Sequence, residues 1–400
     1  MEKRFENGIL TIFIADSLTA DNAEKFFNDV NSLCSSCHDY NSLVINADGL
    51  KCISSAGLKI LLKLSKLNKD SGKNFSVQDV SPEIYNVFKV AGFNKLMTVI
   101  KKLREISIND CPLIGEGRSS KVFRIDPETV VKCFYPNVRL DNIIHELEMD
   151  KKVFLLDIPT AISYDLVKIG DSYGAVFELI AADTVGHAIT NNIDKFDEIT
   201  KKFADLYKKI HSTKLKADSG FPSVKTKWLD WLDGMKNYYT SEEFDFMNKM
   251  LDSIPERYTM IHCDFHENNV LYQNGELIII DMADVGFGHP ILDLAGGAFR
   301  THCSIMPDRK ATHGLSPENM LRFWDTVLKF YFDIDDNNLL NEIKEVCEAF
   351  GFLRSALFPM KHSQISESLR NWHINDARKF LFSRKDWALE QTRKLPEIFN

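Results

Sequence analysis

The sequence predicts an α/β domain followed by a larger α+β domain whose C-terminal region is helical. Three observations predict this fold class. Strand-like apolar runs alternate with amphipathic segments of helical spacing over about the first 100 residues. Further short apolar runs, with glycines between them, continue to about residue 180. The rest of the chain consists mainly of segments with helical patterns that are rich in Phe, Trp and Leu.

The bulk composition favours a globular protein of the cytoplasm. The 400 residues exceed the usual size of one hydrophobic core, so we expect two or three domains. The content of 44% hydrophobic and 26% charged residues is ordinary for a soluble protein. No apolar run approaches the roughly 20 residues of a membrane helix, and the N-terminus lacks the apolar segment of a signal peptide. We therefore expect a cytoplasmic location and no membrane partner.

The charge distribution bears on the class of partner. The net charge is -8, and most of the acidic excess lies after residue 105. There is no basic stripe with interleaved aromatic residues, so we expect no nucleic acid partner. An acidic C-terminal part is compatible with a cationic substrate.

The N-terminal elements follow from hydrophobic periodicity and capping. Ser81 and Pro82 fit the cap and the first position of a helix. The predicted elements, in order, are a strand at 9–15, a helix from about Thr19, a strand at 43–45, a helix at 59–67, a strand at 75–77 and the helix that follows Ser81. Strands alternating with helices indicate a sheet covered by helices.

The turn Ile-Ser-Ser-Ala-Gly-Leu at 53–58 resembles the signature turn of the STAS domain, the fold of anti-sigma factor antagonists. The resemblance covers about residues 1–100 and implies a regulatory domain that binds a protein partner. In that family a Ser or Thr at the start of the following helix is phosphorylated. Aligning on Gly57 puts Ala56 at the commonly modified position, so Ser55 is the remaining candidate phosphosite. The alternative is that Ser54 and Ser55 only cap the helix.

A change of character after the charged segment 100–110 predicts a domain boundary, with domains at 1–104, 105–182 and 183–400. Gly115 and Gly117 lie between two apolar runs. Glycines in such a loop let backbone N–H groups approach phosphate oxygens closely, although a plain hairpin is the alternative. Lys132 lies inside an apolar strand at 129–134. A buried lysine is costly without a carboxylate or phosphate partner, so we expect one.

The segment 260–284 carries the strongest chemical signal. Apolar runs at 270–272 and 277–280 flank Asn274-Gly275, which is a strong hairpin signal. The hairpin would bring Asn269 and Asp281 to the same end, with Asp264 on the loop leading in. Carboxylate and amide oxygens suit a hard cation such as Mg2+. The alternative is a polar hairpin with incidental acids.

The spacing of His262, Asp264 and Asn269, followed by Asp281, resembles the catalytic and metal-binding loops of the aminoglycoside phosphotransferase and choline kinase group. Cys263 stands where that family usually has Gly. The resemblance covers roughly residues 110–300 and implies a bilobal protein-kinase-like fold with a helical C-terminal region. It also implies that Asp264 is the catalytic base and that Asn269 and Asp281 are Mg2+ ligands.

The same resemblance implies an ATP site. Gly115 and Gly117 would cover the phosphates, and Lys132 would hold them while paired with a glutamate of the helix at 140–155. Glu146 and Glu148 are both available there, and Glu146 matches the family position better. Backbone groups from Glu178 to Ile180 would bind adenine as the hinge.

Two further implications complete the prediction. Asp293, in the stretch 286–295, would help to fix the catalytic loop, and the acceptor would be a small hydroxylated molecule. The competing hypothesis is a signalling protein whose kinase-like domain phosphorylates or regulates a protein partner or its own Ser55. The presence of the N-terminal domain favours this second hypothesis, because a purely metabolic kinase needs no such module.

Overall fold

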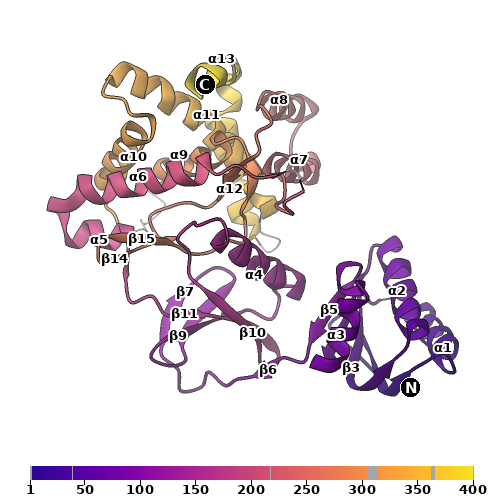
Figure 1. Ribbon diagram of the computed structural model, residues 1–400. Helices are drawn as coiled ribbons and strands as arrows, with labels where there is room; N and C mark the ends of the chain where they lie inside the picture. The colour runs from indigo at the N-terminus through magenta and orange to yellow at the C-terminus, as the bar shows by residue number, and fades with distance from the viewer. Residues whose placement is uncertain (1, 38, 217, 305–313, 362–364, 400) are drawn as a thin grey trace. The chain divides into compact units, whose positions relative to one another are not determined.

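The computed structural model describes residues 2–37, 39–216, 218–304, 314–361 and 365–399 (Figure 1). The chain divides into two compact units. The first unit comprises Met1–Ile125, Val131–Asp141 and Asp165–Val176, and the second comprises Asp126–Val130, Asn142–Tyr164 and Phe177–Asn400. The predicted order of an α/β domain, a second mixed domain and a helical C-terminal region is confirmed.

The first unit begins with a five-stranded sheet in the order β1-β2-β3-β4-β5. β1 is antiparallel to β2, and the other neighbours are parallel. Buried side chains of the strands and of three helices form one hydrophobic core. The elements are β1 (Lys3–Glu6), β2 (Ile9–Leu18), α1 (Ala23–Ser36), β3 (Ser42–Ile53), α2 (Ser55–Asp70), β4 (Asn74–Val80), α3 (Pro82–Val90), η1 (Phe93–Lys95) and β5 (Thr98–Lys101).

Two N-terminal elements differ in extent from the prediction. The first helix begins at Ala23 rather than about Thr19, because the Asn22 side chain accepts a hydrogen bond from the Thr19 N–H (2.8 Å) and holds a turn there. β3 continues to Ile53, pairing with β2 through two irregularities in register. The predicted cap of α3 is confirmed, since Ser81 Oγ accepts from the Ile84 N–H at 3.4 Å.

The start of α2 explains the residues of the signature turn. Ser54 is the N-cap, and its Oγ accepts from the Gly57 N–H at 3.4 Å. Ser55 is the first helical residue and its side chain is exposed. A Cβ on Gly57 would lie 2.3 Å from the Leu18 carbonyl oxygen, so only glycine lets the helix approach β2 this closely.

A second sheet has six strands in the order β6-β10-β11-β9-β8-β7. β7 and β8 are antiparallel, with the Gly117 N–H donating to the Ser120 carbonyl oxygen (2.8 Å) at their turn. The elements are β6 (Arg104–Glu105), β7 (Leu113–Glu116), β8 (Ser120–Arg124), β9 (Thr129–Phe134), α4 (Leu140–Phe154), β10 (Ser163–Ile169) and β11 (Ser172–Glu178). β9 and α4 match the predicted strand at 129–134 and helix at 140–155, whereas β6 lies in the charged segment predicted as a domain boundary.

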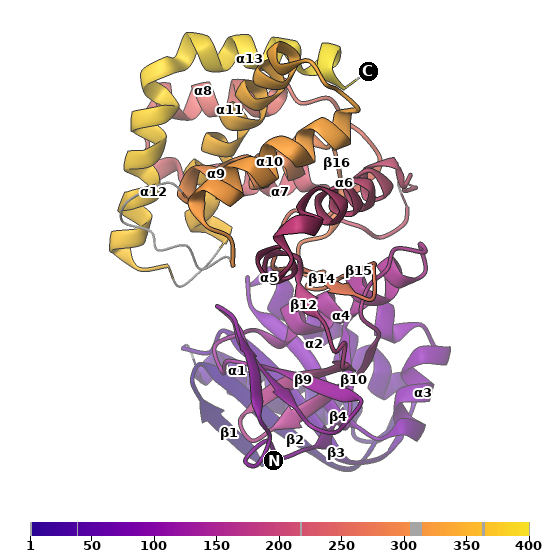
Figure 2. The same ribbon diagram turned by 90° about the vertical axis from the view of Figure 1, so that its left-hand side faces the viewer.

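The rest of the chain is mainly helical around one large core. α9 packs against both α10 and α11, and Figure 2 shows α9 and α10 side by side. The elements are β12 (Asp183–Thr184), α5 (Val185–Asn191), η2 (Ile193–Lys195), α6 (Phe196–Ser212), α7 (Val224–Gly234), η3 (Lys236–Tyr238), α8 (Ser241–Asp252), β13 (Thr259–Ile261), β14 (Val270–Gln273), β15 (Glu276–Ile279), β16 (Gly286–Gly288), α9 (Ile291–Ser304), α10 (Pro317–Phe332), α11 (Asn337–Lys361), α12 (Glu367–Phe380), η4 (Phe382–Arg384) and α13 (Lys385–Ile398). None of the helices in the described ranges combines the length and the apolar character needed to cross a membrane.

Candidate active site

The predicted hairpin forms and brings the three oxygen-bearing residues together. β14 and β15 pair antiparallel, and Asn274 and Gly275 between them have φ values of 52° and 90°, as a tight hairpin turn requires. The Ile280 N–H donates to the Asn269 carbonyl oxygen at 2.9 Å, which sets Asn269 beside the residue preceding Asp281. Asn269 Nδ2 donates to the Asp264 carbonyl oxygen at 3.0 Å. These contacts all lie within the second unit.

The loop that carries Asp264 is fixed by Asp293 of α9. Its two carboxylate oxygens accept from the backbone N–H groups of His262 (2.7 Å) and Cys263 (2.9 Å). His211 Nε2 lies 3.2 Å from Asp293 Oδ2. Burial alone would raise the pKa of Asp293, but hydrogen bonds and the charge of His211 outweigh burial and lower it. The predicted supporting role of Asp293 is confirmed, and His211 at the end of α6 supports Asp293 in turn.

Cys263 has a left-handed backbone conformation, with φ at 65°. That conformation costs little for glycine and strains a residue with a Cβ. The backbone geometry therefore explains why glycine is usual at this position in the family that the sequence resembles. The thiol is buried, and burial raises its pKa well above the ordinary value. A thiol in this state is a poor nucleophile, so Cys263 acts on loop geometry.

Asp264 lies among cationic side chains. Its Oδ1 accepts from Arg354 Nη2 at 3.3 Å and lies 3.4 Å from Lys361 Nζ. Its Oδ2 lies 3.8 Å from His266 Nε2, which is beyond hydrogen-bond distance. Burial would raise the pKa of Asp264, but Lys361, His266 and Arg354 together hold it well below its usual value. The carboxylate is therefore ionised at neutral pH, with Oδ1 engaged and Oδ2 facing the weaker contact.

Lys361, the last residue of α11, bridges two carboxylates. Its Nζ lies 2.7 Å from Asp284 Oδ2 as well as 3.4 Å from Asp264 Oδ1. Lys227 of α7 holds the other oxygen of Asp284 at 2.6 Å. Burial disfavours the charged lysine, yet the two carboxylates raise the pKa of Lys361. The ammonium thus stays charged and ties the catalytic loop to the segment after Asp281.

A buried ion pair supports the loop between Asp264 and Asn269. Glu267 is 1% exposed and accepts two parallel hydrogen bonds from Arg300, with Nε at 2.9 Å from Oε2 and Nη2 at 2.6 Å from Oε1. The Glu267 carbonyl oxygen also accepts from the Gly186 N–H of α5 at 3.2 Å. The Glu267 carboxylate is thus paired with Arg300 and has a structural role, so the chemistry of the site falls to the neighbouring residues.

The oxygen atoms of this site fit a hard cation that takes some ligands from the protein and the others from a substrate. The Asn269 amide nitrogen is turned toward the Asp264 carbonyl, so its Oδ1 is the oxygen left to bind a cation. Asp281 supplies a carboxylate at the end of the hairpin. Within the described ranges, no cluster of three or more His, Cys, Asp or Glu side chains could hold a metal alone. A cation held by Asn269 and Asp281 would therefore need further oxygen ligands, such as phosphates.

The residues predicted to bind nucleotide are distributed over both units. Gly115, Gly117 and Lys132 belong to the first unit, and Lys132 is half-buried on β9. Added Cβ atoms on Gly115 and Gly117 would come no closer than 3.6 and 3.7 Å to other atoms. Packing of the chain therefore does not explain these two glycines.

In the second unit Glu146 is buried on α4, and Glu178 and Ile180 lie at and beyond the end of β11. Glu178 Oε1 accepts from the Ile162 N–H at 2.7 Å. The Leu179 N–H donates to the Glu128 carbonyl oxygen, also at 2.7 Å. The segment predicted as the hinge is thus held by hydrogen bonds at Glu178 and Leu179.

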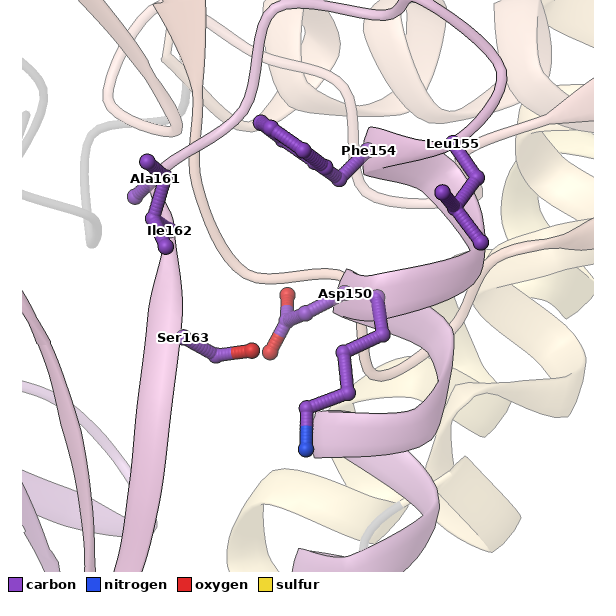
Figure 3. Close-up of a pocket in the computed structure, with 7 residues that line it drawn as sticks. Asp150, Phe154, Leu155, Ala161, Ile162 and Ser163 are labelled. Carbon is purple, nitrogen blue, oxygen red and sulfur yellow. The ribbon is translucent and has the colours of Figure 1, made fainter.

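A separate pocket of about 280 Å³ lies between the end of α4 and the start of β10. Figure 3 shows Ser163 on the strand turned toward the Asp150 carboxylate on the helix, with Phe154 and Leu155 above them. Its lining consists of Asp150, Lys151, Phe154, Leu155, Ala161, Ile162 and Ser163. None of the predicted site residues contributes to it.

Sequence reasoning missed the cations around Asp264. Arg354 and Lys361 interrupt an apolar run and are seven residues apart, which places them on one face of a helix. Charged residues on a buried helical face require partners, so this spacing was a usable signal. Asp284 and Lys227 gave no comparable signal, because their pairing joins residues 57 apart in sequence.

Two family models define the class of protein. The model of the family described as "Phosphotransferase enzyme family" matches residues 110–310. The STAS domain model matches residues 1–106. The chain therefore belongs to the phosphotransferase enzyme family and carries an N-terminal STAS domain. The comparison with curated proteins finds no match.

Solved structures similar to this chain include several kinases. An ADP-bound aminoglycoside phosphotransferase is 18% identical, with 77% of this chain and 99% of that chain covered and a TM-score of 0.46. A choline/ethanolamine kinase family protein from Mesorhizobium loti is 14% identical, with 71% and 92% covered and a TM-score of 0.48. An amicoumacin kinase in complex with AMP-PNP, Ca2+ and its substrate is 14% identical, with 75% and 93% covered and a TM-score of 0.47.

Proposed function

We propose that the protein is an ATP- and Mg2+-dependent phosphotransferase that transfers the γ-phosphate to a hydroxyl group of a small molecule. Family membership supports the reaction class. The observation that carries the proposal is the convergence of Asp264, Asn269 and Asp281 on one loop and hairpin, held by Asp293. Asp264 orients the acceptor hydroxyl and takes its proton, and Oδ2 is the oxygen suited to this because Oδ1 is already bound by cations.

Asn269 and Asp281 would hold Mg2+, which neutralises phosphate charge when it is bound. Packing within the chain leaves room for a Cβ at Gly115 and Gly117, which supports a role in which the glycines let the backbone approach phosphates. We assign Lys132 to bind the α- and β-phosphates of ATP. Glu146 would be the carboxylate partner of Lys132. We assign the binding of adenine to backbone groups of Glu178 and Ile180. In this scheme the chain contributes by placing the reactants, since phosphoryl transfer needs little covalent help from the protein.

Replacing the catalytic carboxylate tests the proposal. Asp264→Asn should lower kcat by about 10²- to 10⁴-fold, because the hydroxyl loses its proton acceptor, while nucleotide affinity changes little. Turnover is measured as ADP release with a panel of hydroxylated compounds, and affinity with a fluorescent nucleotide. Asp205→Asn is the matched control, since Asp205 is exposed and pairs only with Lys201 among the described residues. Wild-type turnover by Asp264→Asn would remove Asp264 from this role.

A second candidate function is supported by the position of Ser55. Its exposed side chain at the first position of α2 suits a phosphoryl group, because a helix N-terminus favours negative charge. In this alternative the kinase-like domain phosphorylates a protein partner or Ser55 itself, and the STAS domain transmits the signal. Labelled ATP followed by mass spectrometry separates the two functions. Label on Ser55 or on a partner protein supports the alternative, and label only in a small hydroxylated compound supports the phosphotransferase.

A further inference from the structure

The guanidinium of Arg354 lies beside the Asp264 carboxylate, and that contact occupies only part of its hydrogen-bonding capacity. Its side chain is only 10% exposed, and Nη2 is 3.3 Å from Asp264 Oδ1. Within the described residues this is the one hydrogen bond that the side chain makes. A guanidinium carries five N–H donors arranged to bind a carboxylate or a phosphate through two parallel bonds. Arg354 therefore has further N–H donors beside Asp264.

The position of this guanidinium is built into the packing of two helices. Arg354 belongs to α11, which begins after the segment that matches the family, and it reaches Asp264 across α9. A Cβ on Gly296 of α9 would lie 2.3 Å from Arg354 Nη1. Glycine at position 296 therefore leaves the space that the guanidinium occupies. Such an arrangement holds the cation in one place, as a binding residue requires.

Among the described residues, Arg354 shares its one carboxylate partner, Asp264, with Lys361. Asp284 is shared by Lys227 and Lys361, and Glu267 is engaged by Arg300. The single carboxylate of Asp264 therefore faces both Arg354 and Lys361. A largely buried cation with incomplete compensation is costly, and an added anion beside it would be stabilised.

We infer that the acceptor carries an anionic group, a carboxylate or a phosphate, that binds the Arg354 guanidinium while its hydroxyl meets Asp264 Oδ2. This inference rests on the proposed phosphotransferase function and specifies its substrate class. In the reaction the acceptor oxygen forms a bond to the γ-phosphorus of ATP, the bond from that phosphorus to the ADP oxygen breaks, and the hydroxyl proton passes to Asp264. The acidic excess of the chain is compatible with a cationic substrate, whereas the local charges at Asp264 favour an anionic one.

A matched pair of acceptors tests the charge preference directly. D-glycerate and glycerol offer comparable hydroxyl groups, and only glycerate carries a carboxylate. Glycerol 3-phosphate adds the phosphate arm, and choline and kanamycin serve as cationic acceptors. We expect kcat/KM to be highest for the anionic compounds. A higher kcat/KM for glycerol, choline or kanamycin than for the anionic compounds overturns the inference and leaves the proposed function standing. ATP consumption that is unaffected by Asp264→Asn with every acceptor shows instead that the proposed function itself fails.

Variants of the guanidinium and of its packing test the assignment to Arg354. Arg354→Gln should raise KM for the anionic acceptor by about 10- to 100-fold with KM for ATP nearly unchanged, because one charge-assisted contact is lost. Arg354→Lys keeps the charge but not the planar fork, so it should recover part of this loss. Gly296→Ala keeps the arginine but displaces it, and should raise the same KM even if Arg354→Gln folds poorly.

Arg378→Gln is the matched control, because Arg378 lies on α12 and pairs with Glu243 at 2.9 Å. It should leave KM for the acceptor unchanged. Folding of each variant is checked by thermal denaturation before the kinetics are compared. An acceptor KM that stays at the wild-type value in folded Arg354→Gln and Gly296→Ala variants would overturn the role of Arg354.

Discussion

At the scale of single residues, the loop that carries Asp264 combines a strained backbone with a carboxylate that lies among cationic side chains. Cys263 adopts a conformation suited to glycine, and Asp293 holds it there by accepting from the N–H groups of His262 and Cys263. The next residue, Asp264, is kept ionised at neutral pH by Lys361 and Arg354. The loop geometry therefore depends on hydrogen bonds to α9, and the charge state of its key residue depends on α11.

A β-branched residue at position 263 should be poorly tolerated. Valine has a strong preference against positive φ, so Cys263→Val should lower the free energy of unfolding by about 1–3 kcal/mol and displace Asp264. Chemical denaturation and turnover with the best acceptor measure the two effects. The matched control is Cys347→Val, the same change at a buried position within α11. Equal losses of stability in both variants would show that the backbone conformation at position 263 is not the cause.

The pKa of His266 gives the folded state a specific pH dependence. Burial, with the nearby charge of Arg300, lowers the pKa of His266 to about 4. The unfolded chain takes up this proton at about pH 6.5, so acid favours the unfolded chain. The contribution of His266 to stability is complete above about pH 6.5 and is lost as the pH falls toward 4.

Replacement of His266 should therefore flatten the pH profile. His266→Asn should reduce the dependence of the unfolding free energy on pH by up to about 1.4 kcal/mol per pH unit between pH 6.5 and 4. His289, whose pKa is lowered to about 3, contributes in the same range in both proteins and cancels in the comparison. Urea denaturation at several pH values gives the slopes, and identical slopes would contradict the predicted pKa of His266.

At the scale of elements, α9 is the helix on which the site is assembled. It supplies Asp293 to the catalytic loop and Arg300 to Glu267. Two adjacent glycines let its neighbours approach, since Gly296 leaves room for Arg354 and Gly297 for the ring of Trp324 on α10. Close helix packing on both sides thus fixes where the carboxylates and cations of the site can lie.

The two glycines should respond differently to the same substitution. A Cβ on Gly297 would lie 2.3 Å from the Trp324 ring, which is too large and too buried to move aside easily. Gly297→Ala should therefore destabilise the fold by about 1–3 kcal/mol, despite the better helix propensity of alanine. Gly296→Ala should change the acceptor KM with a smaller loss of stability, because the added Cβ meets the far end of the long Arg354 side chain, which can be displaced more easily than a ring. Thermal unfolding of both variants provides the comparison.

At the scale of the whole molecule, local signals predicted the fold and the centre of the site. The Asn274-Gly275 turn needs only its own backbone preferences, so the hairpin and the neighbourhood of Asn269 and Asp281 followed from the sequence. The cap at Ser81 is also local. The contact between Arg354 and Asp264 joins residues 90 apart and depends on how α11 lies on α9, so no local pattern could specify it.

In the proposed reaction, where Asp264 takes the acceptor proton, its low pKa has a consequence for repeated turnover. A carboxyl group that binds its proton weakly cannot retain the one it takes from an acceptor hydroxyl. The proton passes on to water once the product leaves, and the group is ready again without a slow deprotonation step. The cations that lower the pKa of Asp264 weaken it as a base. The same cations keep the loss of its proton from limiting turnover of the proposed reaction at neutral pH.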